Sequence, residues 1–144
     1  PWAVLGQIQR RRGELDRAVQ SYQRAVSLDR GQASYANNLG ACLLDQERVE
    51  EAAARFRRAT RLDPGMFSAY LNLGQALLML GDPGGATTAL RRAREVAPER
   101  AEALYLLGVA ASDRERSQEF FRRYLAMDPD GAWAEDARAR LISD

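Results

Sequence analysis

Cys42 is the single cysteine among the 144 residues of this chain and the strongest nucleophile that the sequence offers. A catalytic thiol needs a basic partner that takes its proton, most often a histidine. The chain contains no histidine, which removes Cys-His and Ser-His pairs and the commonest metal ligand. We therefore expect Cys42 to be a small buried core residue, and one cysteine cannot form an internal disulfide.

Carboxylates could act in acid–base chemistry, but their spacing is that of a solvated helix surface, as in Glu47, Glu50 and Glu51. General acid–base catalysis needs a carboxyl group held out of water, and no acid here lies on an apolar face. The pair Gly84-Gly85 lacks the Gly-Lys-Ser/Thr of a phosphate-binding loop, and no cluster has metal-ligand spacing. The sequence predicts a protein that is not an enzyme and has no metal or cofactor.

The charge balance gives no general attraction to nucleic acid or to anionic membranes, since 21 basic residues face 20 acidic ones. No apolar run approaches the roughly 18–20 residues that span a bilayer, and no signal peptide is visible. All the basic residues are arginine, which is typical of a GC-rich bacterial genome, and either the cytoplasm or the periplasm is compatible. Because the chain opens with Pro1, we expect a fragment of a longer protein.

The elements that position these side chains repeat along the chain with a period of 34 residues. Residues 33–66 and 67–100 share 11 identities without a gap, where unrelated segments would share about two or three. Within each unit, apolar residues recur three and four positions apart, which indicates helices. In the third unit this spacing predicts a first helix over about 67–80, then the stop signals Gly81-Asp82-Pro83 and a second helix.

A glycine recurs in the middle of each first helix, where it costs about 1 kcal/mol relative to alanine. The glycines are Gly6, Gly40, Gly74 and Gly108. A repeated cost of this kind predicts a close approach between the two helices of each unit. We expect the opposing surface to be the alanines of the second helices, namely Ala18, Ala52 and Ala86.

The recurring Leu-Gly, alanine, aromatic, alanine and closing proline over 34 residues resemble the tetratricopeptide repeat (TPR) across about residues 1–130. The resemblance implies an all-α right-handed superhelix with repeats at about 1–32, 33–66, 67–100 and 101–130 and a capping helix at about 131–142. Two positions depart from the family pattern, Arg30 at a closing proline and Glu47 at the glycine between helices. The fourth unit is short, so we expect its first helix near 101–111.

Members of this family usually bind peptides on the concave face, which the first helices form. Asn38 and Asn72 share one column there, and asparagine can both donate to and accept from a peptide backbone. We expect an exposed apolar set beside them, because methionine and tyrosine adapt to varied partners. The predicted groove consists of Gln7, Asn37, Asn38, Leu44, Leu71, Asn72, Gln75, Leu78, Met79, Tyr105, Leu106 and Val109.

The sequence therefore predicts a protein–protein interaction scaffold within a bacterial multiprotein assembly. Chaperone-tail binding through a lysine-containing carboxylate clamp does not fit, because the chain has no lysine. An alternative is self-association into an oligomer through the edge formed by Pro1–Arg12. A less favoured alternative is binding of nucleic acid or anionic lipid through a convex arginine stripe. We do not expect nucleic acid as a partner, and we expect a membrane only if the protein is part of an envelope complex. The stripe is Arg24, Arg57, Arg58, Arg91, Arg92, Arg122 and Arg123.

Overall fold

The computed structural model describes residues 1–143, and within them it contains nine α-helices and no β-strand. The helices are α1 (Trp2–Arg11), α2 (Leu15–Leu28), α3 (Ala33–Asp45), α4 (Val49–Leu62), α5 (Phe67–Met79), α6 (Pro83–Val96), α7 (Glu102–Ala110), α8 (Arg114–Met127) and α9 (Ala134–Ile142). The expected all-α solenoid is confirmed: eight helices form four successive antiparallel hairpins, and α9 follows the last.

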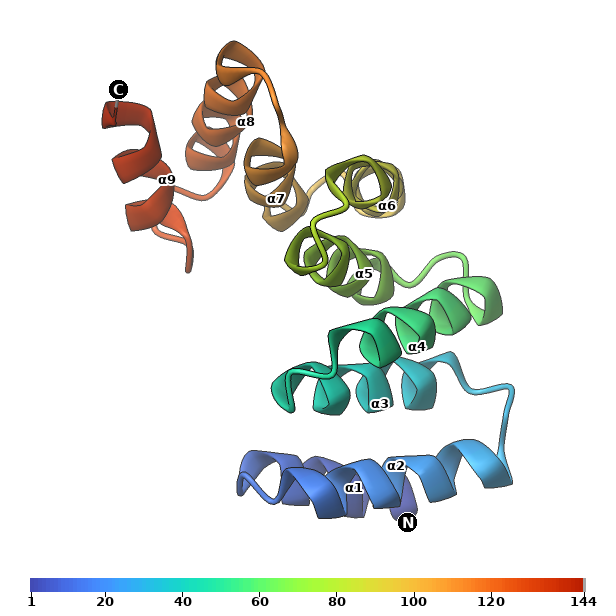
Figure 1. The fold of residues 1–144 in the computed structure, drawn as a ribbon. Coiled ribbons are helices and arrows are strands. Elements are labelled where there is room, and N and C mark those ends of the chain that lie inside the picture. Colours follow the sequence, from blue (N-terminus) through green and yellow to red (C-terminus); the bar gives the residue numbers. More distant parts are fainter. Residues whose placement is uncertain (144) are drawn as a thin grey trace.

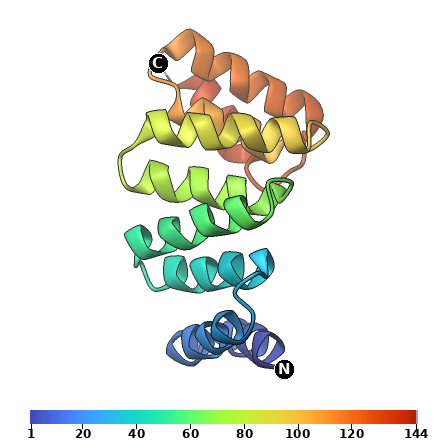
Figure 2. The ribbon, with the colours of Figure 1, turned by 90° about the vertical axis from the view of Figure 1, so that its right-hand side faces the viewer.

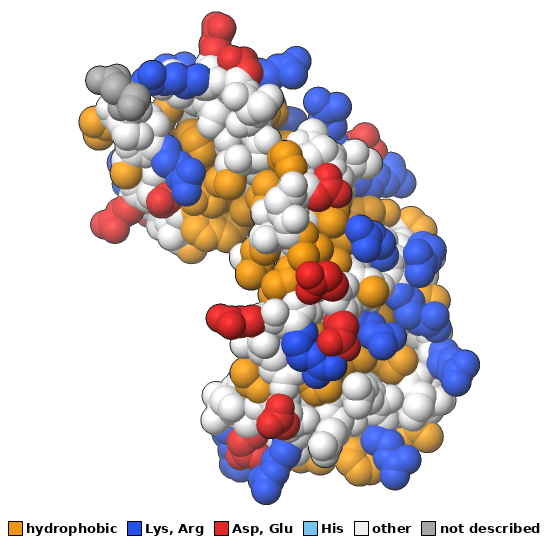
Figure 3. Space-filling view, viewed as in Figure 1, with side chains coloured by type: hydrophobic (Ala, Val, Ile, Leu, Met, Phe, Trp, Pro, Cys, Tyr) orange, Lys and Arg blue, Asp and Glu red, His pale blue; other side chains and the backbone are white. Residues whose placement is uncertain are grey.

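The hairpins stack in chain order into a curved solenoid with the two termini at opposite ends (Figures 1 and 2). Each helix packs mainly on the helices before and after it in the chain. The first helices of the hairpins, α1, α3, α5 and α7, also contact one another in sequence and form the inner row. The space-filling view shows that the solenoid curves around a hollow on the side where its N-terminal and C-terminal parts face each other (Figure 3).

The turns within the first three hairpins each use a left-handed backbone residue. Gly13 has φ +75° and Gly81 has φ +74°, as expected for glycine after a helix C-terminus. Glu47 takes the same place in the second hairpin with φ 62°, a conformation that strains a residue with a Cβ. The third turn continues with Asp82, whose carboxylate accepts a hydrogen bond from the Gly85 N–H (2.9 Å), while Pro83 begins α6.

The close approach predicted at the glycine column is confirmed, but the opposing residues are not the alanines. A Cβ on Gly40 would lie 2.7 Å from the Phe56 ring, and one on Gly74 would lie 2.5 Å from Leu90. Gly6 and Gly108 face Tyr22 and Phe121 in the same way. The glycines therefore make room for one large side chain of the second helix, which fills the middle of each hairpin.

The fourth hairpin begins with a helix of 9 residues, against 13 in α3 and in α5, so the predicted shortening is confirmed. Tyr124 occupies the position where the other repeats have alanine, and it is 1% exposed. Its hydroxyl accepts a hydrogen bond from the Trp133 N–H (3.2 Å) at the start of α9. The bulky tyrosine thus ties the last hairpin to α9, whose Ala134 and Ala137 are buried.

Candidate functional site

An interhelical amide pair lies at the centre of the inner row. The Asn72 side-chain amide on α5 donates to the Asn37 carbonyl oxygen on α3 over 3.1 Å. Asn37 is 9% exposed, whereas Asn38 is half-buried. Asn72 therefore contacts Asn37, although the residue aligned with it in the repeat is the next one, Asn38. The pair fixes α3 against α5 and leaves Asn38 and the second amide hydrogen of Asn72 for other partners.

The apolar candidates for the groove lie on the same helices, α3 and α5, and on α7. Leu44, Leu71 and Leu78 are half-buried and pack against the core, and Gln75 is also half-buried. Met79 is 55% exposed, and Val109 is 36% exposed. Figure 3 shows hydrophobic side chains gathered in the hollow over α5, α7 and α9.

The expectation that Tyr105 and Leu106 are exposed groove residues is wrong, since they are 8% and 5% exposed. The indole of Trp133 stacks on the Tyr105 ring with centroids 4.8 Å apart, and the Tyr105 hydroxyl donates to Asp136 of α9. Leu106 belongs to the same buried cluster as the α9 alanines. Helix α9 and the residue before it thus cover Tyr105, and the sequence pattern of the repeats alone did not reveal this because α9 lies outside the repeats.

The N-terminal end of the inner row is polar. Gln7 is exposed on α1 and, together with Asn38, lines a shallow hollow of about 490 Å³ between α1 and α3. Arg10 crosses it to Asp45, with Nε 2.6 Å from the carboxylate. The hydrogen bond to Asp45 raises the pKa of Arg10. The candidate on α1 is therefore polar and those on α7 are apolar or aromatic, whereas α3 and α5 carry candidates of both kinds.

The arginine stripe lies on the second helices, along the outer edge of the solenoid (Figure 3). Several of its members are engaged within the chain. Arg24 lies over the Trp2 ring, Arg58 donates to the Arg30 carbonyl (3.1 Å) and Arg92 pairs with Glu95 (2.6 Å). Arg122 donates to Gln118 (3.3 Å), and the remaining members, Arg57, Arg91 and Arg123, are exposed.

Cys42, the side chain first considered for chemistry, is enclosed in the core. Cys42 is 0% exposed, as expected, and burial raises the pKa of its thiol to about 11, so the thiol is protonated at neutral pH. Among residues 1–143, no three His, Cys, Asp or Glu residues come together in a way that could hold a metal ion. In the same part of the chain no helix combines the length and the apolar character needed to cross a bilayer.

Stacked antiparallel hairpins with a glycine-to-large-residue contact in each define a helical-repeat solenoid. Two models of one family match the chain, both described as tetratricopeptide repeat, over residues 3–67 and residues 43–109. The chain belongs to the tetratricopeptide repeat family. No curated protein matches the sequence significantly.

Solved structures of similar fold include a MamA protein, at 21% identity and a TM-score of 0.83, over 97% of this chain and 82% of that one. MamA residues 41 to the end from Desulfovibrio magneticus RS-1 have 22% sequence identity and a TM-score of 0.83, and the match covers 96% of this chain and 82% of that one. YrrB, described as a TPR protein with an unusual peptide-binding site, has 23% sequence identity and a TM-score of 0.79, and the match covers 99% of this chain and 80% of that one. At these identities the likeness concerns the fold.

Proposed function

We propose that this chain is a protein-binding scaffold that holds a peptide segment of another protein against the inner surface of α3, α5 and α7. The observation that carries the proposal is the set of accessible apolar side chains on the inner helices, with Met79 of α5 at 55% and Val109 of α7 at 36% exposure. Accessible apolar groups gathered on a concave surface mark binding sites for other molecules. We assign the half-buried Leu71 and Leu78 of α5, which pack against the core, to the same surface as its apolar floor.

The amides of Asn38, Asn72 and Gln75 supply the polar part of this surface. Each can pair with a peptide N–H or C=O group without selecting a side chain, so we assign them to the backbone of the bound segment. The apolar floor then selects its side chains. The peptide-binding site named for YrrB supports a peptide ligand. A bacterial multiprotein assembly as the setting is part of the proposal and rests on the composition, in which every basic residue is arginine.

The test compares two double variants with the same change in chemistry. Met79→Glu with Val109→Glu places charge in the hollow, whereas Leu28→Glu with Met127→Glu replaces exposed apolar residues outside the candidate groove (72% and 46%). Affinity capture from a lysate of the source organism should recover the same partner with wild type and with the control variant, and lose it with the first. Recovery of every partner by both variants, with both folded, would contradict binding in the hollow.

The N-terminal edge of the solenoid, formed by Pro1–Arg12, favours self-association as a second candidate function. Trp2, Leu5 and Ile8 are 39%, 41% and 43% exposed. Their equivalents in the second repeat, Ala36, Leu39 and Cys42, are at most 2% exposed. This edge therefore presents apolar surface of the kind that is covered inside the solenoid.

Sedimentation over a hundredfold concentration range tests self-association. An average mass that rises with concentration, and that falls to the monomer value in Leu5→Glu with Ile8→Glu, would support it. A constant monomer mass for wild type would rule it out.

A further inference from the structure

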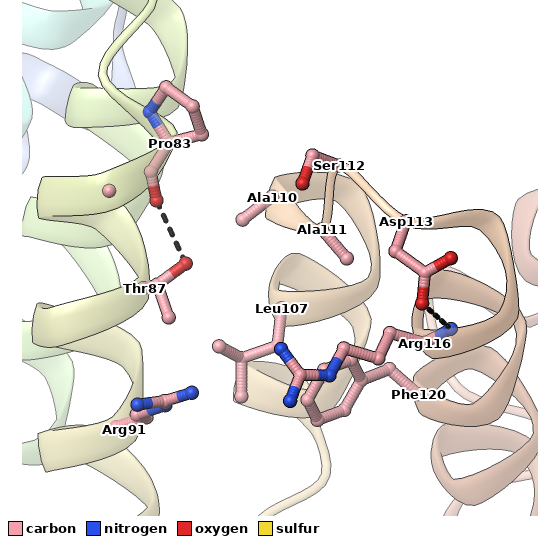
Figure 4. Close-up of a pocket in the computed structure, with 11 residues that line it drawn as sticks. Pro83, Thr87, Arg91, Leu107, Ala110, Ala111, Ser112, Asp113, Arg116 and Phe120 are labelled. Atoms are coloured by element: carbon pink, nitrogen blue, oxygen red, sulfur yellow. Dashed lines mark hydrogen bonds between the residues drawn. The ribbon is translucent and has the colours of Figure 1, made fainter.

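A separate cavity of about 340 Å³ lies between α6, α7 and α8 (Figure 4). Leu107, Ala110, Ala111 and Phe120 supply its apolar walls. Two arginines reach it from opposite sides, Arg91 from α6 and Arg116 from α8. None of the residues predicted for the inner groove lines it, so the cavity is distinct from the proposed peptide surface.

The cavity lies where the fourth repeat lacks a side chain that the second and third repeats have. Counted from the repeat glycine, Ala111 occupies the position of Leu43 and Leu77, which are 2% and 5% exposed. Helix α7 ends at Ala110, and Ala111 is extended (φ −67°, ψ 128°), so the chain turns toward α8 early. The space that a leucine fills in two earlier repeats is therefore open here.

The two arginines bring uncompensated positive charge to this space. Throughout residues 1–143, neither the Arg91 nor the Arg116 guanidinium takes part in an ion pair or a side-chain hydrogen bond. In Figure 4 both guanidinium groups lie beside Leu107. The one nearby carboxylate in the lining, Asp113, accepts from the backbone N–H groups of Glu115 and Arg116 at the start of α8.

The corresponding place between α2 and α4 is built differently. There the Asp16 carboxylate accepts a hydrogen bond from Gln46 (2.6 Å), and Arg48 is paired with Glu51 (2.7 Å). Two repeats later, the residue equivalent to Asp16 is Gly84, which lines the α6–α8 cavity. The charged groups between α2 and α4 thus have partners within the chain. The α6–α8 cavity instead combines apolar walls with two arginines that have no acidic partner among residues 1–143.

We propose that the α6–α8 cavity binds an acidic peptide segment in which an apolar side chain is flanked by carboxylates. The apolar side chain occupies the space of the missing leucine, over Leu107, Ala111 and Phe120. The flanking carboxylates pair with Arg91 and Arg116, whose planar guanidinium groups suit bidentate contact with a carboxylate. The volume is at the small end of ligand sites, which fits one side chain of leucine size.

The experiment is a titration of the full chain, followed by the backbone amide NMR signals of Ala110, Ala111 and Asp113. The probe is the N-acetylated peptide amide Glu-Leu-Glu-Leu-Glu, and its control has glutamine at every glutamate. We expect saturable shifts with the acidic peptide and at least about tenfold weaker binding of the control. Inorganic phosphate alone forms a third arm, because a free anion could contact the same arginines.

Three variants make the test specific to the cavity. Ala111→Leu restores the residue found in the second and third repeats and fills the space, so binding should be lost. Arg91→Glu should weaken binding by about tenfold or more, whereas Arg57→Glu, the same change at the equivalent position of α4, should leave it within about twofold. Unchanged affinity in Arg91→Glu and a folded Ala111→Leu would overturn the proposal. So would equal binding of phosphate and peptide, or no shift of the cavity amides.

Discussion

The ring of Trp133 lies 4.8 Å from the ring of Tyr105, nearly parallel to it at 20°. Tyr105 also contacts the rings of Phe121 and Tyr124, each at 5.7 Å between centroids. This aromatic cluster joins the inner helix α7, the outer helix α8 and the start of α9. It turns what would be the inner surface of the last repeat into part of the protein interior.

Trp133→Ala should lower the free energy of unfolding by about 2 kcal/mol, because it removes a large half-buried ring and the stacking contact. Urea unfolding followed by circular dichroism measures the change. The control is Trp2→Ala at the opposite end, where the ring is 39% exposed and less should be lost. Equal losses in the two variants would show that the aromatic cluster contributes little.

Asn72→Ala should cost about 1–2 kcal/mol, because it leaves the Asn37 carbonyl, 9% exposed, without its amide partner. A double-mutant cycle with Asn37→Ala measures the coupling between the two side chains. We expect the double variant to be less destabilised than the sum of the single variants by about 1 kcal/mol. Strict additivity would mean that the amide pair is no more than a surface contact.

Gly40→Ala and Gly84→Ala make the same change with opposite expected results. At Gly40 the new methyl group would meet the Phe56 ring at 2.7 Å, and we expect a loss of about 2 kcal/mol. At Gly84, in the first turn of α6, the nearest group is 3.8 Å away, so the higher helix propensity of alanine should add about 0.5 kcal/mol. Thermal unfolding of both variants checks the signs, and stabilisation by Gly40→Ala would contradict the close contact.

Glu47→Gly should stabilise the chain by about 1 kcal/mol, because the residue has φ 62° and glycine adopts this conformation without strain. The reciprocal change, Gly81→Ala at φ +74°, should destabilise it by a similar amount, about 1 kcal/mol. Denaturant unfolding of the two single variants measures both effects. If Glu47→Gly unfolds more easily than wild type, the strain at Glu47 is compensated by a contact of its side chain.

The buried thiol of Cys42 should make stability fall in alkaline solution. Its pKa is raised to about 11 by burial, so between about pH 9 and pH 11 the unfolded chain releases a proton that the folded chain keeps. The stabilisation is complete below pH 9 and is lost as the pH rises toward 11. Cys42→Ala should remove about 2 kcal/mol of this decline. Parallel unfolding curves for the two proteins across pH 8–11 would contradict it.

The hairpins were predictable from the sequence because they depend on local signals that recur with the period. Gly81, Asp82 and Pro83 mark one turn, and Gly40 with its counterparts marks the close contact between helices. Burial of Cys42 followed from its alignment with alanines. These features involve residues within one repeat, so the repeat pattern contains them.

Contacts between repeats were harder to predict. Asn38 and Asn72 align in the sequence, yet Asn72 bonds Asn37, because neighbouring inner helices meet one position out of register. Tyr105 aligns with the half-buried Leu71, but α9 lies outside the repeat pattern and its Asp136, together with Trp133, covers Tyr105. Leu106 aligns with the half-buried Asn38 and Asn72, yet it is 5% exposed. The α6–α8 cavity depends on the single replacement of leucine by Ala111 together with the early end of α7. Such features require the spatial neighbours of each helix.

The chain-order packing of the solenoid also bears on how the protein reaches its folded state. Since nearly all extensive helix contacts join neighbours in the chain, few distant segments must meet for folding to proceed. Contacts of short sequence separation are typical of proteins that fold in microseconds to milliseconds. Folding can begin at any hairpin and spread to its neighbours, so the protein should recover quickly when one end unravels.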